Sequence, residues 1–273
     1  MAALPLRPQV FAILSALIEE RSGLHYDLAD ADMIADKLST RAIEAGFDSL
    51  LDYYYYLRYD DASQAELDAL LDILVVNETY FFRELDTLKR MISDFVEPQV
   101  RAGARPRVWC AACSTGEEPL TIAMLLADRG LLDRVELTAS DISSRALARA
   151  QAGEFGPRSL RHPPPDGLDA RWIERTEGRL RVRSELKDAI RWRRLNLLDE
   201  SAIAAMGPFD VIVCRNVLIY FSDETAKRVI QSLTTALRPG GALFVGVSES
   251  LLRFGTSLEC EERGGVFLYL KER

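Results

Sequence analysis

Two short stretches of the chain combine residue types that a purely structural role does not require. Residues 77–84 read Asn-Glu-Thr-Tyr-Phe-Phe-Arg-Glu, so three consecutive aromatics lie beside ionic and amide groups. Residues 111–119 read Ala-Ala-Cys-Ser-Thr-Gly-Glu-Glu-Pro, a small-residue turn that leaves an apolar strand and opens a helix. Such a turn lets the backbone approach a nucleotide-like ligand. Together they predict a cofactor site with a charged, aromatic-lined wall.

The small-residue turn is expected at the carboxyl end of the first strand, where open α/β sheets bind their ligands. The amides that open the next helix favour an anionic group, either a phosphate or a carboxylate. Gly116 is the only glycine of the turn, so the Gly-x-Gly-x-x-Gly spacing of dinucleotide enzymes is absent. This disfavours nicotinamide and flavin, while an ordinary tight turn stays open as an alternative.

Asp141 follows the second expected strand. A carboxylate at this place accepts hydrogen bonds from the two hydroxyls of a ribose in nucleotide-binding α/β folds. The same side chain could instead cap the helix expected over residues 143–151, a role that aspartate fills well. With the small-residue turn nearby, we favour the ribose interpretation.

Two later stretches place polar residues beyond strands. Asn196 and Leu197 end the stretch that starts at Arg191, and an amide beside an apolar side chain could recognise an adenine edge and cover its ring. Residues 214–221 read Cys-Arg-Asn-Val-Leu-Ile-Tyr-Phe, which puts polar groups at the mouth of a central strand. A turn asparagine and a buried Tyr220 are the plainer alternatives.

Cys110 and Cys113 have a spacing typical of redox or zinc sites. No second cysteine pair accompanies them, and both histidines, His25 and His162, lie far away in the sequence. We therefore expect neither a metal nor a disulfide. No apolar run approaches the roughly 18 residues that cross a bilayer, and the cysteine pattern is not that of a secreted framework, so we expect a cytoplasmic location.

The charge is unevenly distributed. The net charge of −8 and the pI of about 5.0 argue against a general nucleic-acid binder, because phosphate contacts need clustered lysines and arginines. Residues 1–76 carry five basic and fourteen acidic side chains, a net of −9, so the remainder sums to +1.

The periodicity of apolar residues changes along the chain. Up to residue 76 it is helical, with breaks at Gly23, Gly46 and residues 60–63, which predicts a small domain of four helices. After about residue 105, short apolar strands alternate with longer helices, which indicates a doubly wound, mostly parallel sheet. The expected strands are 107–112, 135–140, 209–214, 242–247 and 266–270, and the expected helices are 117–127, 143–151 and 224–237, the last ended by residues 239–241.

Residues 155–190 interrupt this alternation. Prolines at 157 and 163–165 break regular structure, and residues 179–183 alternate with a period of two. We expect a small inserted β-subdomain with one basic face.

In order, these motifs resemble those of the CheR-type chemotaxis receptor methyltransferases. The resemblance runs from about Val10 to Tyr269, and the motifs at 77–83 and 214–221 are its most specific part. It implies an all-α domain over residues 1–76 that docks on receptors, and a class I S-adenosylmethionine-dependent methyltransferase domain of Rossmann-like α/β fold over 77–273, with 155–190 as its β-subdomain. The implied activity is methyl transfer to glutamate side chains in the cytoplasmic helices of chemoreceptors, with S-adenosylhomocysteine as product.

The resemblance also implies roles for individual residues. Arg83 and Tyr220 would face the substrate carboxylate as catalytic residues. The cofactor would be lined by Asn77, Thr79, Arg83, Gly116, Glu117, Asp141, Asn196, Leu197, Arg215 and Asn216.

Two features depart from the family pattern. Members often meet receptors with a basic helical face, and here Lys37 and Arg41 share a face, but their domain is acidic. The turn within residues 174–179 is shorter than in relatives that bind a receptor's C-terminal pentapeptide, so we expect no binding of such a peptide. We further expect a monomer that does not insert into the membrane.

Two other functions compete with this one. A methyltransferase for a small carboxylic acid would use the same chemistry, although it would need no helical docking domain. A cofactor-sensing or scaffold protein that has lost catalysis is the other alternative, and the intact Asn77, Arg83, Asp141 and Tyr220 argue against it.

Overall fold

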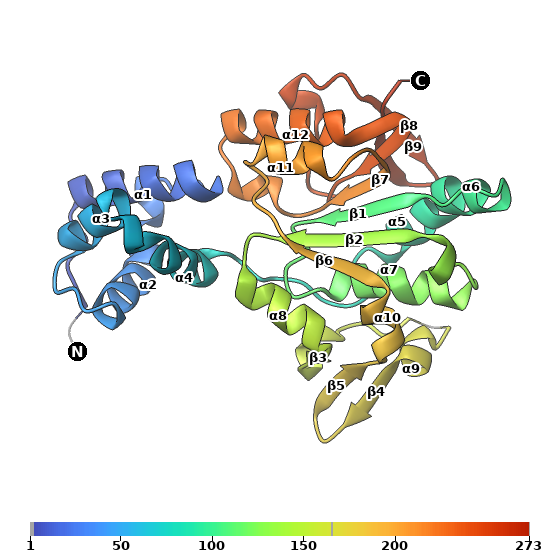
Figure 1. The fold of residues 1–273 in the computed structure, drawn as a ribbon, viewed down its shortest axis with the longest axis horizontal. Helices are drawn as coiled ribbons and strands as arrows, with labels where there is room; N and C mark the ends of the chain where they lie inside the picture. Colours follow the sequence, from blue (N-terminus) through green and yellow to red (C-terminus); the bar gives the residue numbers. More distant parts are fainter. Residues whose placement is uncertain (1–2, 165, 273) are drawn as a thin grey trace. The chain divides into compact units, whose positions relative to one another are not determined.

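The computed structural model describes residues 3–164 and 166–272. The chain forms two compact units, drawn in Figure 1. The first contains the residues up to Val76 together with Tyr220–Thr225, and the second contains Asn77–Ile219 and the residues from Ala226 onward. A linear division at residue 76 does not anticipate that 220–225 group with the helical unit.

The first unit is helical, and the four predicted helices are confirmed. Its apolar core contains side chains such as Leu14, Leu38 and Leu70, each 0 % exposed. The helices are α1 (Pro8–Ser22), α2 (Ala31–Glu44), α3 (Leu50–Tyr59) and α4 (Gln64–Leu74), with 3-10 turns at Leu28–Asp30 and Asp61–Ser63.

A polar cluster joins three of these helices around Glu66. Its Oε1 atom accepts hydrogen bonds from Arg41 Nε at 2.7 Å and from the Tyr53 hydroxyl at 2.6 Å. Arg41 also pairs with Glu44. Of the two basic residues that share a face of α2, Arg41 is therefore paired with carboxylates of its own unit.

Residues 220–225 lie against the end of α1 within this unit. The His25 amide donates to the Tyr220 carbonyl at 2.9 Å, and the two segments form one antiparallel bridge. Gly23 ends α1 with a φ of 82°, and a Cβ there would lie 3.0 Å from the Phe221 ring. Glycine thus allows both the left-handed cap and the close approach.

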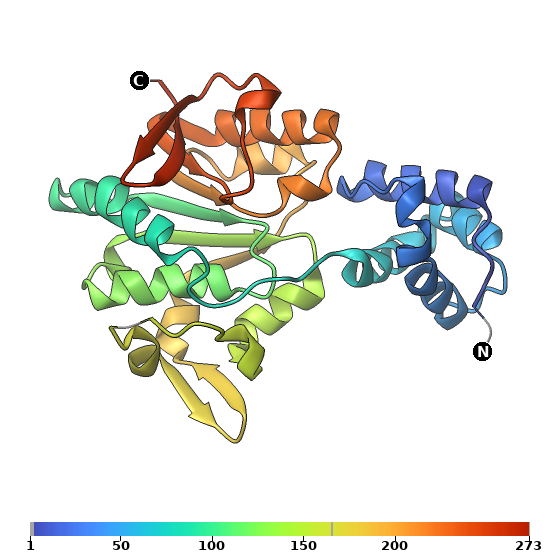
Figure 2. The same cartoon turned by 180° about the vertical axis from the view of Figure 1, so that it is seen from behind.

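The second unit is built on a seven-stranded sheet of order β6-β2-β1-β7-β8-β10-β9, with helices on both faces (Figures 1 and 2). Neighbours from β6 to β8 are parallel, whereas β10 is antiparallel to both β8 and β9. The predicted doubly wound, mostly parallel sheet is confirmed. The strands are β1 (Arg107–Ala111), β2 (Glu136–Asp141), β6 (Ile190–Arg194), β7 (Phe209–Cys214), β8 (Leu237–Phe244), β9 (Glu259–Arg263) and β10 (Val266–Leu270).

The helices of this unit cover an apolar core that includes Trp109, Leu120 and Phe244, each 0 % exposed. They are α5 (Leu85–Met91), a π-helical turn (Ile92–Val96), α6 (Glu97–Arg101), α7 (Glu117–Asp128), α8 (Ser144–Ala152), α9 (Leu168–Trp172), α10 (Ser184–Asp188), α11 (Glu200–Ala205) and α12 (Asp223–Ala236), whose first three residues belong to the first unit.

Two strands differ from the sequence-based expectation. β8 begins at Leu237 rather than at 242, so Pro239 lies inside the strand, where the register against β7 shifts between Phe209 and Val211. A bulge of this kind tolerates a proline. β9 was not predicted, because it is an edge strand that reads Glu-Cys-Glu-Glu-Arg and lacks an apolar run.

The predicted β-subdomain is present as a three-stranded antiparallel sheet of order β3-β5-β4, with β3 (Glu154–Phe155), β4 (Ile173–Thr176) and β5 (Arg179–Val182). Glu177 and Gly178 join β4 to β5, with φ values of 46° and 77°. Two residues with positive φ form the tight hairpin turn that matches strand twist. In β5, Leu180 and Val182 are buried while Arg179 and Arg181 face solvent.

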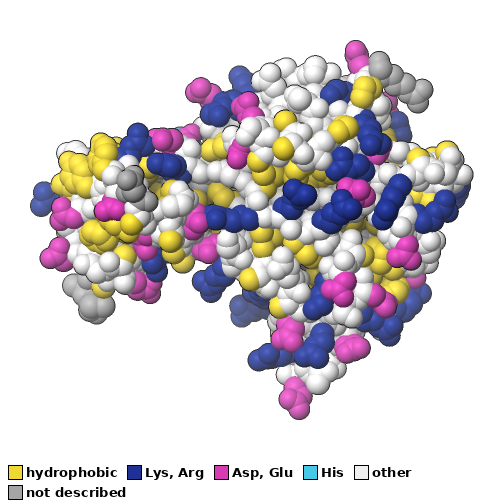
Figure 3. Space-filling model, in the orientation of Figure 1, with side chains coloured by type: hydrophobic (Ala, Val, Ile, Leu, Met, Phe, Trp, Pro, Cys, Tyr) yellow, Lys and Arg dark blue, Asp and Glu magenta, His cyan; other side chains and the backbone are white. Residues whose placement is uncertain are grey.

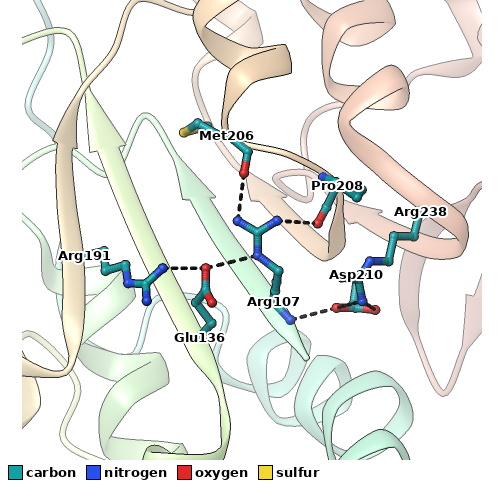
Figure 4. Close-up of polar contacts among 7 residues, drawn as sticks. All are labelled: Arg107, Glu136, Arg191, Met206, Pro208, Asp210 and Arg238. Atoms are coloured by element: carbon teal, nitrogen blue, oxygen red, sulfur yellow. Dashed lines mark hydrogen bonds and ion pairs between the residues drawn. The ribbon is translucent and has the colours of Figure 1, made fainter. Parts of the chain in front are cut away.

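An arginine holds the starts of three parallel strands together (Figure 4). Arg107 donates to the carbonyls of Met206 and Pro208 at 2.7 and 2.8 Å and pairs with Glu136 at 3.0 Å. Its backbone amide donates to Asp210 at 2.7 Å. These contacts lie at the amino ends of β1, β2 and β7, away from the edge where the site residues follow the strands.

The edge strand β6 is protected by charge. Arg191, Arg193 and Arg194 are exposed along it, and Figure 3 shows basic side chains gathered over this part of the α/β unit. Exposed charges on an edge strand oppose pairing with another chain. Among residues 3–164 and 166–272, no helix is long and apolar enough to cross a membrane.

Candidate active site

The predicted site residues of the second unit follow strands that are neighbours in the sheet. β1 pairs with β2 on one side and with β7 on the other, all in parallel. The loops after Ala111, Asp141 and Cys214 therefore leave the sheet at the same edge, as expected for a ligand site in an open α/β fold.

Asp141 ties the small-residue turn to the end of β2. Its Oδ2 atom accepts a hydrogen bond from the Ser114 amide at 2.7 Å, and its Oδ1 atom accepts one from the Ser143 amide at 2.9 Å. The side chain of Ser143, not Asp141, caps α8 by accepting from the Ala146 amide at 3.0 Å. The alternative role of Asp141 as helix cap is therefore excluded, and the carboxylate lies fixed at the rim of the sheet.

The turn after β1 has an unusual backbone. Ala112 and Ser114 adopt positive φ values of 54° and 51°, and Gly116 follows at 92°. Left-handed conformations of non-glycine residues concentrate at ligand sites, where the surrounding structure enforces them. At Gly116 a Cβ would lie 2.5 Å from the Ala150 Cβ, so this glycine allows α7 and α8 to pack closely. Its contact with the cofactor stays a prediction.

Glu117 is almost fully buried and connects three segments. One carboxylate oxygen accepts a hydrogen bond from the Thr115 hydroxyl at 2.6 Å, and the other accepts one from Ser159 at 2.8 Å. Ser159 in turn accepts, through its carbonyl, the amide of Phe81 at 2.7 Å. Glu117 therefore links the turn after β1 to the aromatic stretch at 77–84.

Fewer aromatic side chains of residues 77–84 are exposed than the sequence suggests. Phe81 and Phe82 are buried, at 0 % and 7 % exposure, and the Phe82 amide donates to Thr121 on α7 at 3.2 Å. Of the three aromatics, only Tyr80 is partly exposed, with the guanidiniums of Arg83 and Arg161 over its ring. The expectation of an aromatic-lined wall is corrected to a single tyrosine between two arginines.

At the start of residues 77–84, Asn77 contacts the turn after β1, and near their end Arg83 is partly exposed to solvent. Asn77 accepts a hydrogen bond from the Ser114 hydroxyl at 3.0 Å, which brings two predicted cofactor segments together. Thr79, two residues after Asn77, is half-buried. Arg83 donates to the Glu78 carbonyl at 3.1 Å, and its side chain keeps 27 % exposure. It is thus oriented but still accessible.

Arg215 lies at the centre of a buried ion cluster. Its side chain is 1 % exposed, and it pairs with Glu118 at 2.5 Å and with Glu84 at 2.9 Å. Burial alone would lower the pKa of Arg215, but the two carboxylates raise it overall. Burial raises the pKa of Glu118. Sequence reasoning missed both glutamates, because Glu84 ends its motif and Glu118 looks like an ordinary first-turn acid.

The remaining predicted residues lie in three places. Asn216 has a φ of 59°, and its amide donates to Glu249 at 2.6 Å. Asn196 accepts from the Leu198 amide at 3.0 Å, and Leu197 is buried. Tyr220 belongs to the helical unit, so its pairing with Arg83 at the substrate stays a prediction.

Three cysteines are buried in the α/β unit. Cys110, Cys113 and Cys214 are buried free thiols whose pKa values burial raises well above the ordinary range. Within the described part of the chain, no cluster of three or more histidines, cysteines and acids could hold a metal.

The residues present fit a nucleoside cofactor that carries a charged group. A buried carboxylate at the rim suits ribose hydroxyls, and the left-handed turn residues have small side chains. The Nε atom of Arg215 is a buried donor without a hydrogen-bond partner among the described residues, which suits an acceptor on a ligand. Together with the strand order, these features define the class of S-adenosylmethionine-dependent methyltransferases.

Comparison with known proteins agrees with this class. Residues 77–263 match the model of the CheR methyltransferase, SAM binding domain, and residues 9–75 match that of the CheR methyltransferase, all-alpha domain. The chain belongs to the CheR methyltransferase family. It is an enzyme that uses S-adenosylmethionine, as the resemblance predicted.

Three relatives are similar over most of this chain. It is 34% identical to chemotaxis protein methyltransferase 2 of Vibrio cholerae, over 87% of this chain and 84% of the relative. It is 36% identical to the chemotaxis protein methyltransferase of Escherichia coli, over 88% and 84%. It is 35% identical to the probable biofilm formation methyltransferase WspC of Pseudomonas aeruginosa, over 86% of this chain and 56% of that protein.

Proposed function

We propose that this enzyme transfers methyl groups from S-adenosylmethionine to glutamate side chains in the cytoplasmic helices of chemoreceptors. The observation that carries the proposal is Asp141, a buried carboxylate fixed at the rim by the amides of Ser114 and Ser143 beside a left-handed turn. The names of the chemotaxis relatives support the substrate class.

The cofactor would be held by residues from four loops. Asp141 would accept from the ribose hydroxyls, and Asn196 with Leu197 would meet the adenine. Asn77, Thr79 and Asn216 would line the remaining pocket, while Glu117 and Gly116 shape it from behind. When bound, S-adenosylmethionine supplies an electrophilic methyl group on a positively charged sulfur.

The protein need not supply a general base for this reaction. A glutamate side chain with an ordinary pKa of about 4.3 is already ionised at neutral pH. Charge is lost as the carboxylate attacks, so a site that excludes water and aligns the carboxylate favours the transition state. The protein's task is to orient the substrate and to keep the site dry.

Arg83 and Tyr220 would divide this task. A tight clamp by Arg83 on the carboxylate would stabilise the ground state most, which slows the reaction. We infer that Arg83 recruits and orients the substrate, and that Tyr220 donates a weaker, neutral hydrogen bond to the attacking carboxylate. The accessible but anchored guanidinium of Arg83 supports this role.

The helical unit would dock on the receptor. Its net charge makes a broad basic docking face unsuitable, and Arg41 is already paired. Lys37 is exposed on α2 and is the remaining basic residue of the face considered above. The turn at Glu177–Gly178 is a minimal hairpin, which supports the expectation that a receptor's C-terminal pentapeptide is not bound. A cytoplasmic monomer completes the proposal.

One experiment separates the candidate functions. Purified enzyme is incubated with methyl-labelled S-adenosylmethionine and membranes enriched in chemoreceptors. We expect label on the receptor that mild base releases as methanol. A labelled small methyl ester without labelled protein would identify the small-acid methyltransferase instead, and no label in either fraction would contradict both.

A further inference from the structure

Glu249 lies in the loop after β8 and belongs to none of the motifs recognised in the sequence. Its carboxylate accepts three backbone hydrogen bonds: from the Asn216 amide at 2.6 Å, from Leu218 at 2.9 Å and from Gly246 at 2.8 Å. The residue is 9% exposed. A buried carboxylate with three amide donors forms strong, charge-assisted hydrogen bonds that fix the position of each donor.

Two of these donors come from the loop after β7, which carries predicted site residues. Asn216 is held with a φ of 59°, a left-handed conformation that persists only where neighbouring groups enforce it. Leu218 starts the short 3-10 turn Leu218–Tyr220. Glu249 thus fixes the backbone on both sides of residue 217, between a predicted cofactor residue and the turn that ends at Tyr220.

Gly246 is an independent sign that this arrangement is closely fitted. A Cβ at this position would lie 2.5 Å from Asn216 Nδ2 and 2.9 Å from Glu249 Oε2. The absence of a side chain therefore lets both groups reach their places. The loop after β8 thus provides the Glu249 carboxylate and the free space at Gly246. The loop after β7 directs two backbone amides to the carboxylate and places the Asn216 side chain in the free space.

We propose that Glu249 is a positioning residue for methyl transfer, which holds Asn216 and Leu218 where the cofactor pocket and the substrate side meet. The inference rests on the proposed function for the identity of the two ligands. If Glu249 only linked two loops, its substitution would lower stability alone. If it is a positioning residue, its substitution also changes cofactor affinity and the turnover number.

The test compares Glu249→Gln with Asp210→Asn. Glutamine keeps the length of the side chain but offers one acceptor oxygen, and its NH₂ group opposes a backbone donor. Asp210 is the matched control, because it is also a buried acid (7% exposed) that accepts a backbone amide, but at the opposite end of the strands. Kd for S-adenosylhomocysteine is measured by calorimetry, kcat by receptor methylation and Tm by circular dichroism.

For Glu249→Gln we expect Kd to rise about tenfold and kcat to fall about tenfold, the effect of losing hydrogen bonds to a charged group. For Asp210→Asn we expect a lower Tm with Kd and kcat within twofold of wild type. Gly246→Ala should reproduce the effect of Glu249→Gln, because its methyl group would clash with Asn216 Nδ2 and with Glu249 Oε2 and so displace the same contact while the carboxylate is kept chemically intact.

The proposal is overturned if Glu249→Gln lowers Tm as Asp210→Asn does but leaves Kd and kcat within twofold of wild type. Should Glu249→Gln fail to fold, the same two measurements on Gly246→Ala decide in its place. Wild-type enzyme that does not bind S-adenosylhomocysteine would overturn the proposed function and this inference together, which separates that failure from the first.

Discussion

The guanidinium of Arg215 donates a hydrogen bond to the backbone carbonyl of Arg83 over 3.0 Å, although 132 positions separate the two residues in the chain. Arg215 also pairs with Glu84, the neighbour of Arg83, and with Glu118. The loop that presents Arg83 is therefore anchored by an ion cluster. Arg215, assigned to the cofactor by resemblance, has a second task in the folded chain.

Removing Arg215 should destabilise the protein strongly. In Arg215→Met the carboxylates of Glu84 and Glu118 lose their buried partner, which costs about 3–5 kcal/mol when a buried pair is broken from one side. Urea unfolding measures the loss. Adding Glu84→Gln and Glu118→Gln to Arg215→Met should recover most of it, and a loss below about 1 kcal/mol for the single variant would contradict a buried cluster.

Arg83 and Tyr220 should affect different kinetic constants. Arg83→Ala should raise KM for the receptor more than it lowers kcat, because recruitment is lost. Tyr220→Phe should lower kcat about tenfold with little change in KM, since it removes one neutral hydrogen bond that matters at the transition state. Steady-state methylation of receptor membranes gives both constants. An unchanged kcat for Tyr220→Phe would remove Tyr220 from the mechanism.

A peptide with the sequence of a receptor C-terminus should not bind. The β4–β5 connection consists of Glu177 and Gly178 alone, which leaves no extended loop to lie along a peptide. Titration calorimetry with such a pentapeptide, and with a scrambled peptide as control, should show no heat beyond dilution. Micromolar affinity for the native peptide alone would refute the prediction.

Arg107 should matter for stability and not for catalysis. Arg107→Ala removes two hydrogen bonds to carbonyls and the pair with Glu136, and we expect a loss of about 2–3 kcal/mol. KM and kcat should stay unchanged, because the cluster lies at the amino ends of the strands. Arg191→Ala is the control: its side chain, 58% exposed, also pairs with Glu136, and should cost less than about 1 kcal/mol.

The pair of His25 and Glu19 should make stability depend on pH. The hydrogen bond with Glu19 raises the pKa of His25. Burial would raise the pKa of Glu19, but hydrogen bonds from His25, Ser222 and Thr225 lower it overall. Because the folded pKa of His25 is raised, its contribution is complete below the ordinary histidine value and is lost as pH rises through the raised value.

The contribution of Glu19 to stability changes with pH in the opposite direction. The contribution of Glu19 is present above the ordinary carboxylate pKa and is lost as pH falls through the lowered value. The Tm difference between wild type and His25→Gln should therefore be largest near about pH 6 and shrink by about pH 8. In a Glu19→Gln background the His25 substitution should show no such trend, and a pH-independent difference in the wild-type background would contradict the pair.

The order of the elements could be predicted because local patterns encode it. Alternating strands and helices indicate a parallel sheet, and the residues after Ala111, Asp141 and Cys214 then meet at one edge by topology alone. Edge strand β9 escaped prediction since nothing apolar marks it. Phe81 and Phe82 were assigned to the wrong surface, because periodicity does not show which side of a short loop is buried.

The contacts that organise the site could not be predicted, because they join residues far apart in the chain. Glu249 accepts an amide 33 positions away and Glu118 pairs with a cation 97 positions away. No local spacing marks either acid. A single sequence shows which residue types are present but not which distant partner each one meets.

The grouping of residues 220–225 with the helical unit bears on how such enzymes can be recombined. The end of α1 holds this segment by the His25 amide and by a gap at Gly23 that fits Phe221. A chimera that exchanged residues 1–76 for those of a relative with other receptor preferences would leave the segment facing a foreign surface. Residues 220–225 would have to be transplanted with the helices, so an exchange of the proposed docking unit requires two grafts rather than one.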